Sequence, residues 1–456
     1  MTCRHARDGL DPPHVTKGFE LGIRRMKNIK PIHGVSALAA ILIIWIGTAL
    51  IGSWKSGHAS RTGAPEAALN CMGVRREPFR IPGMEGATAI AFQSSHLVVL
   101  DGEGRMWSYL VTQSPTCEGQ ATSIDPAHSP MSRIAPSAVD AIGITSTGTL
   151  ATWEAQERTR MCPSGIRGSV CGAFLKEHIT GLREITGSAS HLLMVTQDGS
   201  VMSTGMNDCG QTGRPLPHLA APRLDIDLVP GLSDIVQVAG GKRSSMALGK
   251  DGRVWTWGNL SHPLIESSSP PQPTLDAVYC GGYENPFHLP EAANPTPEPV
   301  AGLPPITAIS SFHGFDLALD RKGRVWGWGY NDCGQLGGDP TTLVERGGFQ
   351  YAPAIIEGLP PITAMAAGRR HALFLGTDGS IWATGDNEFG QLATRATLPF
   401  GGQTCVSSTQ RGGLDPYSGK PVRIEGIPTA KAVAADNGHS AAIDEDGHVW
   451  IWGRYP

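Results

Sequence analysis

The sequence predicts an all-β fold: a seven-bladed β-propeller of four-stranded blades, preceded by one transmembrane helix. Three observations support this prediction. A hairpin-like segment recurs seven times after residue 75, the copies are irregularly spaced, and one long apolar run lies near the N-terminus. A unit that recurs at variable spacing indicates one supersecondary structure per repeat, joined by connections of different lengths. Units of this kind stack side by side into a closed ring of β-sheets.

The repeat is clearest at residues 313–337, HGFDLALDRKGRVWGWGYNDCGQLG. Apolar residues alternate before the turn at Lys322 and Gly323, and an aromatic-rich run follows it, which is the pattern of a β-hairpin. The turn glycine recurs at Gly104, Gly148, Gly199, Gly252, Gly323, Gly379 and Gly447. A tryptophan follows three residues later in five copies, namely Trp107, Trp255, Trp326, Trp382 and Trp450. We expect these tryptophans to be buried between neighbouring blades.

Two more β segments precede each hairpin, as at 353–360 and 362–371, which gives four strands per unit. The last copy ends after its third strand. The segment from Glu77 resembles the segment from Lys420, which precedes that last copy. We therefore predict that Pro78–Pro82 supplies the missing outer strand and closes the ring, since closure removes an exposed sheet edge. The propeller domain then spans residues 77–456.

The N-terminal part divides into three segments. Residues 1–33 carry seven Lys or Arg and form a basic cytoplasmic tail, residues 34–54 are uncharged over the length of a bilayer, and residues 55–76 are a linker. The excess of positive charge before the apolar run places the N-terminus in the cytoplasm. The propeller is then periplasmic or extracellular, attached to the membrane through residues 34–54. The alternative is a signal peptide that starts at Met26 and is cleaved, which would release a secreted domain.

Cysteine spacing predicts disulfides in the propeller. Eight of the nine cysteines follow the apolar run: Cys71, Cys117, Cys162, Cys171, Cys209, Cys280, Cys333 and Cys405. Cys209 and Cys333 share one repeat position, and each is followed by a cysteine at nearly the same distance. We predict the pairs Cys209–Cys280 and Cys333–Cys405, and expect Cys162–Cys171 and Cys71–Cys117 as well. Buried thiols are the alternative, because eight cysteines allow many connectivities.

The repeated motifs resemble the regulator of chromosome condensation repeat family, in a bacterial-type form that is membrane-anchored or secreted. They comprise a His-bearing strand, an Asp-Gly turn, Val-Trp-x-Trp-Gly and Asn-x-x-Gly-Gln-Leu-Gly, at 251–259, 322–337, 378–392 and 446–453. The resemblance covers residues 77–456 and implies a seven-bladed propeller. Members of this family include a nucleotide exchange factor, a light sensor and a secreted β-lactamase inhibitor, so the resemblance implies fold more than function. The inhibitor branch implies a cell-wall enzyme or β-lactamase as the partner.

The sequence predicts no catalytic, cofactor-binding or metal site. Histidines recur at His96, His191, His371 and His439, and aspartates recur at Asp101, Asp198, Asp251, Asp378 and Asp446. Repetition in several blades indicates structural hydrogen bonds and turn capping. The motifs of serine hydrolases, phosphate-binding loops and zinc proteases are absent from the sequence. The rival hypothesis is an extracytoplasmic enzyme or carbohydrate binder, with Glu85, Asp316 or His313 in the central channel.

Charge argues against nucleic acid as a partner. From Cys71 onward the chain has 28 Lys and Arg against 37 Asp and Glu, a net charge of −9 with His neutral. An acidic domain repels a phosphate backbone. A domain outside the cytoplasm also cannot meet a cytosolic GTPase, which makes nucleotide exchange the less favoured function.

Three consecutive blades carry long inserts between their third and fourth strands, at about 259–297, 330–352 and 386–420. Long loops on a rigid scaffold are where binding sites concentrate. The inserts contain aromatic residues, which are enriched at the cores of protein interfaces: Tyr279, Tyr283, Phe287, Phe349, Tyr351, Phe400 and Tyr417. The sequence thus predicts a non-enzymatic module that binds a partner protein through the loops of blades four to six.

Overall fold

The computed structural model describes residues 74–93, 96–110, 121–124, 130–136, 141–153, 179–188, 190–207, 209–215, 223–259, 293–340, 342–343, 348–394, 405 and 417–454. The predicted transmembrane segment 34–54 lies outside these residues. Among the described residues, no helix has the length and apolar character needed to cross a bilayer.

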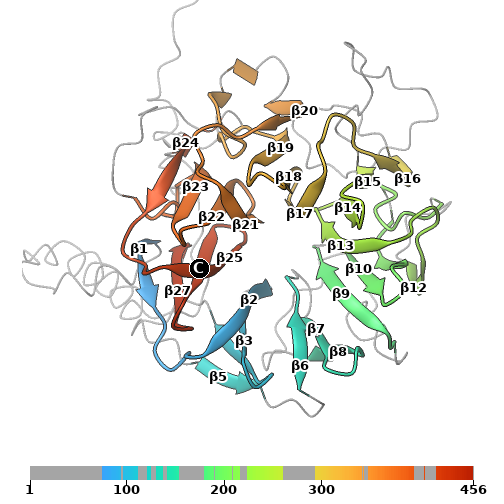
Figure 1. Cartoon of the computed structure of the whole chain (residues 1–456), viewed down its shortest axis with the longest axis horizontal. Helices are drawn as coiled ribbons and strands as arrows, with labels where there is room; N and C mark the ends of the chain where they lie inside the picture. The colour runs from blue at the N-terminus through green and yellow to red at the C-terminus, as the bar shows by residue number, and fades with distance from the viewer. Residues whose placement is uncertain are drawn as a thin grey trace, which may run out of the picture. The chain divides into compact units, whose positions relative to one another are not determined.

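Seven antiparallel sheets follow one another along the chain and surround a central axis (Figure 1). Six have four strands, and the second has three within the described residues. The all-β seven-bladed propeller predicted from the sequence is therefore confirmed. In chain order the blades are β2 (Ala87–Gln93), β3 (His96–Asp101), β4 (Met106–Leu110), β5 (Ala121–Ile124); β6 (Met131–Ile134), β7 (Ala141–Thr145), β8 (Leu150–Trp153); β9 (Leu182–Gly187), β10 (His191–Thr196), β11 (Val201–Gly205), β12 (Arg223–Leu228); β13 (Ile235–Gly240), β14 (Ser244–Gly249), β15 (Val254–Asn259), β16 (Ala293–Pro299); β17 (Ile306–Phe312), β18 (Phe315–Asp320), β19 (Val325–Tyr330), β20 (Phe349–Ile355); β21 (Ile362–Ala367), β22 (His371–Gly376), β23 (Ile381–Asp386), β24 (Tyr417–Ile424); and β25 (Ala430–Ala435), β26 (His439–Asp444), β27 (Val449–Arg454) with β1 (Val74–Arg80).

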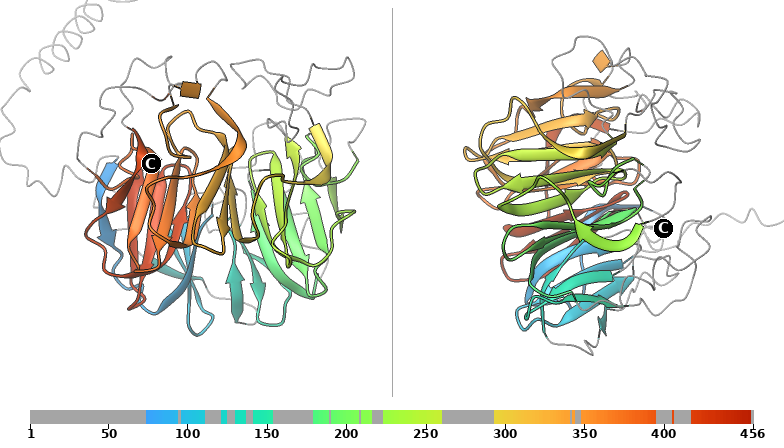
Figure 2. Two further views of the ribbon diagram at one scale, coloured as in Figure 1. Left: turned by 45° about the horizontal axis from the view of Figure 1, so that its top comes forward. Right: turned by 90° about the vertical axis from the view of Figure 1, so that its right-hand side faces the viewer.

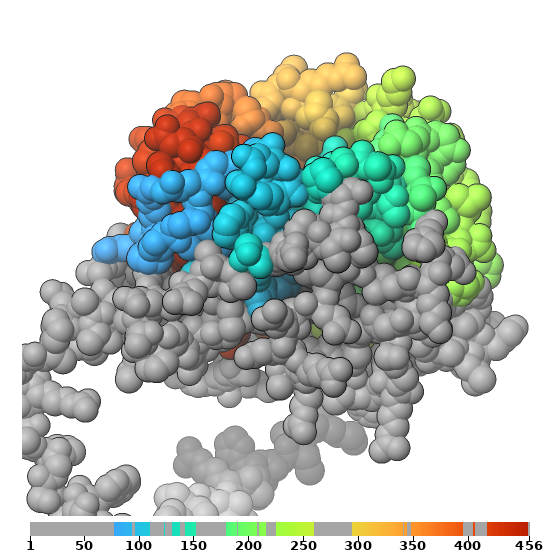
Figure 3. All heavy atoms as spheres, turned by 90° about the horizontal axis from the view of Figure 1, so that it is seen from below, coloured from blue at the N-terminus to red at the C-terminus, as the bar shows by residue number. Residues whose placement is uncertain are grey.

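The last blade takes its outer strand from the beginning of the propeller. β1 pairs antiparallel with β27, with Val74 opposite Arg454 and Phe79 opposite Ile451. The sequence placed this strand at Pro78–Pro82, whereas in the structure it spans Val74–Arg80. Figure 3 shows the first strands, in blue, directly beside the last blade, in red. The outer edge of β27 is thus covered by β1.

Each hydrophobic cluster lies between two adjacent blades. One such cluster joins Leu248 and Val254 of blade four to Ile306 and Ala318 of blade five. The second strands of blades four to seven are buried at every position, because both faces of each sheet pack against a neighbour. The side view in Figure 2 shows the sheets stacked in this way. The propeller has no single core, and its stability depends on contact between blades.

The turn glycines make the same contact in every blade. In each, the glycine carbonyl oxygen accepts a hydrogen bond from the first strand of the following blade. The donor–acceptor pairs are Met131–Gly104 (3.1 Å), Leu182–Gly148 (2.9 Å), Ile235–Gly199 (3.0 Å), Ile306–Gly252 (2.9 Å), Ile362–Gly323 (2.9 Å), Ala430–Gly379 (2.9 Å) and Ala87–Gly447 (3.0 Å). The last of these joins blade seven to blade one. The hairpin turns thus form a continuous ring of hydrogen bonds, on an edge of the propeller that we call the turn edge.

The repeated tryptophans differ from the prediction. The five that follow the turn glycine by three residues are only half-buried. The tryptophans two residues further on, Trp257, Trp328 and Trp452, are fully buried between blades. Trp107, Trp326, Trp382 and Trp450 donate their indole N–H to side chains of the hairpin turn, as Trp326 does to Asp320 (3.2 Å). Side chains two residues apart on a strand point to the same face of the sheet, so both sets of tryptophans share a face. How deeply each set is buried depends on the neighbouring sheet.

Two features favour glycine at position 323, its positive φ and the close approach of the next blade, and replacement by alanine should separate their effects. Gly323 has φ +75°, and a Cβ there would lie 3.0 Å from the backbone nitrogen of Ile362 in the next blade. Gly302 has φ +78° but no atom within 4 Å of such a Cβ, so Gly302→Ala is the matched control. We expect Gly302→Ala to lower the free energy of unfolding by about 1 kcal/mol through backbone strain, and Gly323→Ala by at least about 3 kcal/mol. Equal losses in urea unfolding would show that the interblade approach is unimportant.

Candidate functional site

The long inserts leave the propeller on the edge opposite the hairpin turns. They connect β15 to β16, β19 to β20, and β23 to β24, as predicted for blades four to six. On the same edge lie the turns between the first and second strands, which hydrogen-bond to the end of each third strand. Asn259 donates to Arg243 (2.8 Å), Tyr330 to Gly314 (3.0 Å) and Asp386 to Arg370 (2.8 Å). We call this edge of blades four to six the insert face.

A disulfide joins two of the inserts. Cys333, in the connection of blade five, is bonded to Cys405, in the connection of blade six, across 72 residues of sequence. Both cysteines are buried with Tyr417 in one small cluster. Of the predicted pairs, Cys333–Cys405 is therefore present. Cys209 is buried, and its predicted partner Cys280 lies outside the described residues, as do Cys71, Cys117, Cys162 and Cys171.

The predicted partner-binding aromatics divide into three groups. Tyr279, Tyr283, Phe287 and Phe400 lie outside the described residues. Phe349 and Tyr417 are 3% and 2% exposed, so they offer almost no surface to a partner. They begin the outer strands β20 and β24, and Phe349 packs on Tyr330 with ring centroids 3.8 Å apart. Tyr351 is half-buried and remains available at the surface.

The Asn-x-x-Gly-Gln motif fixes the start of each connection that carries it. In blade six, the side-chain oxygen of Asn387 accepts from Leu392 (3.0 Å), and that of Gln391 accepts from Phe389 (2.8 Å). The main-chain oxygen of Gln391 then accepts from Ser440 (3.0 Å) and Trp452 (2.9 Å) of blade seven. Gln211 of blade three is bonded in the same way to Ser245 and Trp257 of blade four. This motif is structural: it ties a loop to the next blade.

Blade four lacks the motif, and blade five differs at the facing position. Asp316 stands where blades four and seven have Ser245 and Ser440, and it is 1% exposed. Burial raises the pKa of Asp316 to about 6, although hydrogen bonding to Ser311 and Trp328 opposes the shift. The long insert of blade four begins directly beside this interface, after Asn259. Sequence reasoning named Asp316 only as a channel residue, because burial between blades is not visible in the hairpin pattern.

The raised pKa of Asp316 predicts a specific pH dependence. Between pH 4 and pH 6 the unfolded chain loses this proton while the folded chain keeps it, so folding stability falls as the pH rises. Asp316→Ser should remove this loss. Relative to wild type, we expect the variant to gain on the order of 2 kcal/mol between pH 4 and pH 7 in urea unfolding. Asp446→Ser, at an exposed position of the blade-seven turn, is the control. A difference between wild type and Asp316→Ser that does not change with pH would contradict this account.

The repeated histidines make contacts between blades. His191 Nε2 lies 2.6 Å from the hydroxyl of Ser245, and His371 Nε2 lies 3.1 Å from that of Ser440. His439 stacks on Phe92 of blade one, with centroids 5.6 Å apart. Burial, and to a lesser degree the neighbouring His439, lowers the pKa of His371 to about 3. These histidines therefore have the structural role that their repetition predicts.

The residues suggested for a channel site do not form one cluster. Glu85 is exposed and pairs with Arg80 (3.3 Å). Its neighbour Gly86 accepts a backbone hydrogen bond from Gly102 (3.2 Å), which belongs to a hairpin turn. Glu85 therefore lies on the turn edge. His313 belongs to the first turn of blade five, on the opposite edge, and has φ +49°. The geometry therefore does not assemble Glu85 with the other two residues into a catalytic group.

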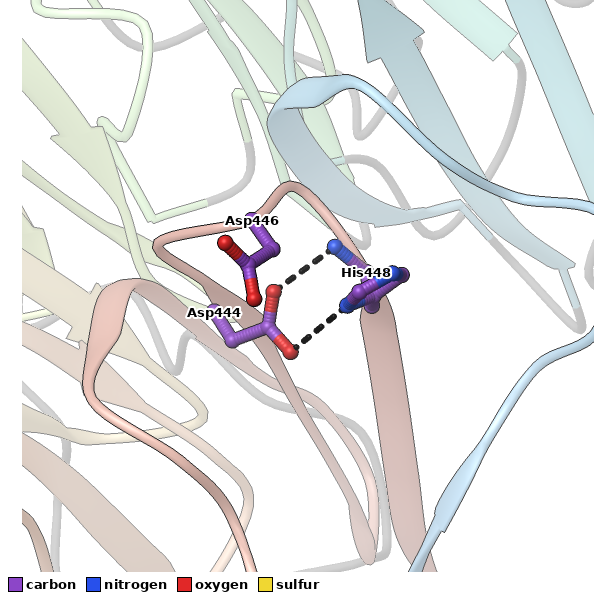
Figure 4. Close-up of side chains that lie close together, drawn as sticks. All are labelled: Asp444, Asp446 and His448. Atoms are coloured by element: carbon purple, nitrogen blue, oxygen red, sulfur yellow. Dashed lines mark hydrogen bonds and ion pairs between the residues drawn. The ribbon is translucent and has the colours of Figure 1, made fainter.

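One side-chain group has the spacing of a metal site. Among the described residues, the ligand atoms of Asp444, Asp446 and His448 lie within 4.8 Å of one another (Figure 4). Asp444 accepts the backbone N–H of His448 (2.8 Å), lies 3.1 Å from His448 Nδ1, and accepts the indole N–H of Trp450 (2.9 Å). Burial opposes ionisation of Asp444, but these hydrogen bonds outweigh it and lower its pKa.

Two other blades contain the same arrangement with arginine in place of His448. Asp320 accepts the backbone N–H (3.0 Å) and Nε–H (2.7 Å) of Arg324, and Asp101 accepts the same groups of Arg105 at 3.0 and 2.7 Å. Each of these aspartates also accepts an indole N–H six residues further on. Since arginine cannot bind a cation, the shared geometry indicates a turn-stabilising carboxylate. The sequence search missed Asp320 and Asp444 because it aligned the aspartates next to the glycine.

Substitutions at Asp444 and His448 distinguish a structural from a metal-binding role. We expect Asp444→Asn to lower the free energy of unfolding by about 2 kcal/mol, because it weakens charge-assisted hydrogen bonds to a buried group. His448→Arg should leave stability unchanged, since arginine occupies this position in blades one and five. Thermal unfolding with and without Zn²⁺ or Ca²⁺ checks this. A metal-dependent rise in Tm that His448→Arg abolishes would contradict the structural role.

Comparison with known proteins agrees with this geometry. A sequence model of the regulator of chromosome condensation (RCC1) repeat matches residues 322–375, and a second matches residues 362–391. Residues 322–391 of this seven-bladed propeller thus match RCC1 repeats. It is 29% identical over 227 residues to protein pim1 of Schizosaccharomyces pombe, which covers 49% of this chain and 37% of pim1. It is 25% identical over 282 residues to the secretion-regulating guanine nucleotide exchange factor of Mus musculus, which covers 60% and 56% of the two chains.

Solved structures of other proteins share the fold. Prp20p from Saccharomyces cerevisiae has a TM-score of 0.57 at 16% identity, covering 87% of this chain and 96% of Prp20p. Human WBSCR16 has a TM-score of 0.56 at 14% identity, covering 83% and 89%. At such identities the likeness shows fold alone. The chain also spans about half or less of the length of the curated relatives it matches.

Proposed function

We propose that this propeller is a non-enzymatic module that binds a partner protein through the insert face. The observation that carries the proposal is the concentration of all three long inserts on one edge of consecutive blades. RCC1-like propellers often mediate protein binding. Prp20p, whose solved structure shares this fold, binds Gsp1p and histones. In this chain, the inserts that are attached to the propeller by the Asn-x-x-Gly-Gln motif and the disulfide would supply the binding surface.

The disulfide supports the same function. Cys333–Cys405 ties the connection of blade five to that of blade six before any partner arrives. The motifs at Asn331 and Asn387 fix the first residues of both connections. A preorganised loop loses less conformational entropy on binding than a free one, which increases affinity. Loops that merely covered the ring would not need this restraint.

We further propose that the propeller acts outside the cytoplasm, anchored through residues 34–54 or secreted. A buried disulfide suits an oxidising compartment. A cell-wall enzyme or β-lactamase is the proposed partner class, by resemblance to the secreted inhibitor branch. Nucleotide exchange remains the less favoured function. For the rival enzyme or carbohydrate binder, Glu85 lies on the opposite edge of the propeller from His313, which argues against a site that combines the three suggested residues.

Affinity capture from native membranes tests the binding function. The full chain is compared with a variant whose inserts are shortened within residues 260–292 and 406–416. The control is Arg321→Glu/Lys322→Glu on the turn edge. We expect one protein to be enriched by wild type and by the control, and lost from the variant, because the inserts supply the contact area.

The shortened variant should unfold at a temperature close to that of wild type, since the shortened segments lie between strands and leave the Asn387 motif and the Cys333–Cys405 disulfide in place. Identical capture by all three baits would contradict binding through the insert face.

A further inference from the structure

The insert face carries a group of positive charges on an otherwise acidic domain. Lys242 and Arg243 form the first turn of blade four, and Arg369 and Arg370 form the equivalent turn of blade six. The turn between them, in blade five, contains His313. In the first turns of blades four to six, four residues are cationic and none is acidic, whereas the first turn of blade seven contains Asp436. The net charge of the domain therefore gives no indication of the charge at this site.

Hydrogen bonds hold these turns in place. Ser190 of blade three donates to the carbonyl oxygen of Lys242 (2.7 Å), and the backbone N–H of Arg369 donates to the carbonyl of Asp436 in blade seven (3.2 Å). The carbonyls of Arg243 and Arg370 each accept from the end of a third strand at 2.8 Å. The backbone positions of the cations are thus fixed by four different blades, while their side chains remain partly or fully exposed.

The cations of blades four and six both lie close enough to His313 of blade five to affect its pKa. Burial lowers the pKa of His313 to about 3, with further lowering by Arg369, Lys242 and Arg370. The histidine is therefore neutral at physiological pH and does not add to the positive charge. Among the described acidic groups, Asp332 lies 3.5 Å from Arg370, and Asp436 lies 3.8 Å from Nδ1 of His439. Arg369 is bonded to the neutral side chain of Asn437 (3.3 Å).

We propose that these turns bind an acidic segment of the partner protein, with Lys242 and Arg369 contacting its carboxylates. This inference rests on the proposed function, because it places the partner on the same face and specifies its charge. A guanidinium group such as that of Arg369 can bind a carboxylate through two parallel hydrogen bonds, and the ammonium group of Lys242 can pair with one as a point charge. Opposite charges across an interface also accelerate association and select the partner. The connections that follow β15, β19 and β23 begin on the same edge as the cationic turns, so one partner can contact both.

Fluorescence anisotropy with a labelled peptide of eight glutamates tests the site on the full chain. We expect binding that weakens as salt increases, and that weakens about tenfold in Lys242→Glu/Arg369→Glu. The control is Arg321→Glu/Lys322→Glu, which makes the same change in net charge on the turn edge and should bind like wild type. Circular dichroism melting of both variants verifies folding.

Three results would overturn the inference. They are no binding of the peptide to wild type, equal binding by both double variants, and full displacement of the peptide by inorganic phosphate at equal concentration, which would indicate a small-anion site. Affinity capture from membranes with the same double variant distinguishes failure of the acidic-segment site from failure of the proposed function. If Lys242→Glu/Arg369→Glu captures the same protein as wild type, the acidic-segment site is wrong while binding through the inserts stands.

Discussion

The ring depends on one backbone hydrogen bond repeated seven times, from the first strand of each blade to the turn glycine of the blade before it. The contact favours a residue with positive φ and no side chain, because an added Cβ at Gly199, Gly252 or Gly323 would lie 3.0 Å from the backbone of the next blade. This requirement explains why glycine is present in every copy while the rest of the repeat varies. The same bond between Gly447 and Ala87, together with the pairing of β1 and β27, joins the two ends of the ring.

The opposite edge is held by side chains instead. The Gln main-chain oxygen, the buried tryptophan and the Ser or Thr hydroxyl connect blades three to four, five to six and six to seven. Between blades four and five, the described residues place a carboxylate, Asp316, at the corresponding position. The departure from the repeat occurs where the longest insert begins. Replacement of a structural motif by an insert is what one expects where a scaffold has acquired a binding loop.

Much of the fold could be predicted from sequence because its signals are local. The turn glycines and the period-two strands can be read without knowing the neighbours of any blade. So can the similar separations of Cys209 from Cys280 and of Cys333 from Cys405. The burial of Phe349 and Tyr417 could not be predicted, since the start of a strand after a long insert has no sequence marker. The cationic turns were also missed. Lys242 and Arg369 belong to different blades, and only the ring brings them near one another.

Hydrogen–deuterium exchange of the full chain, with and without its captured partner, tests the central claim most directly. The account predicts that the partner slows exchange at 331–343, 368–370 and 387–394, on the insert face, and leaves the hairpin turns at 250–253 and 321–324 unchanged. Protection of those hairpin turns, with no change on the insert face, would contradict it. That result would place the binding surface on the turn edge.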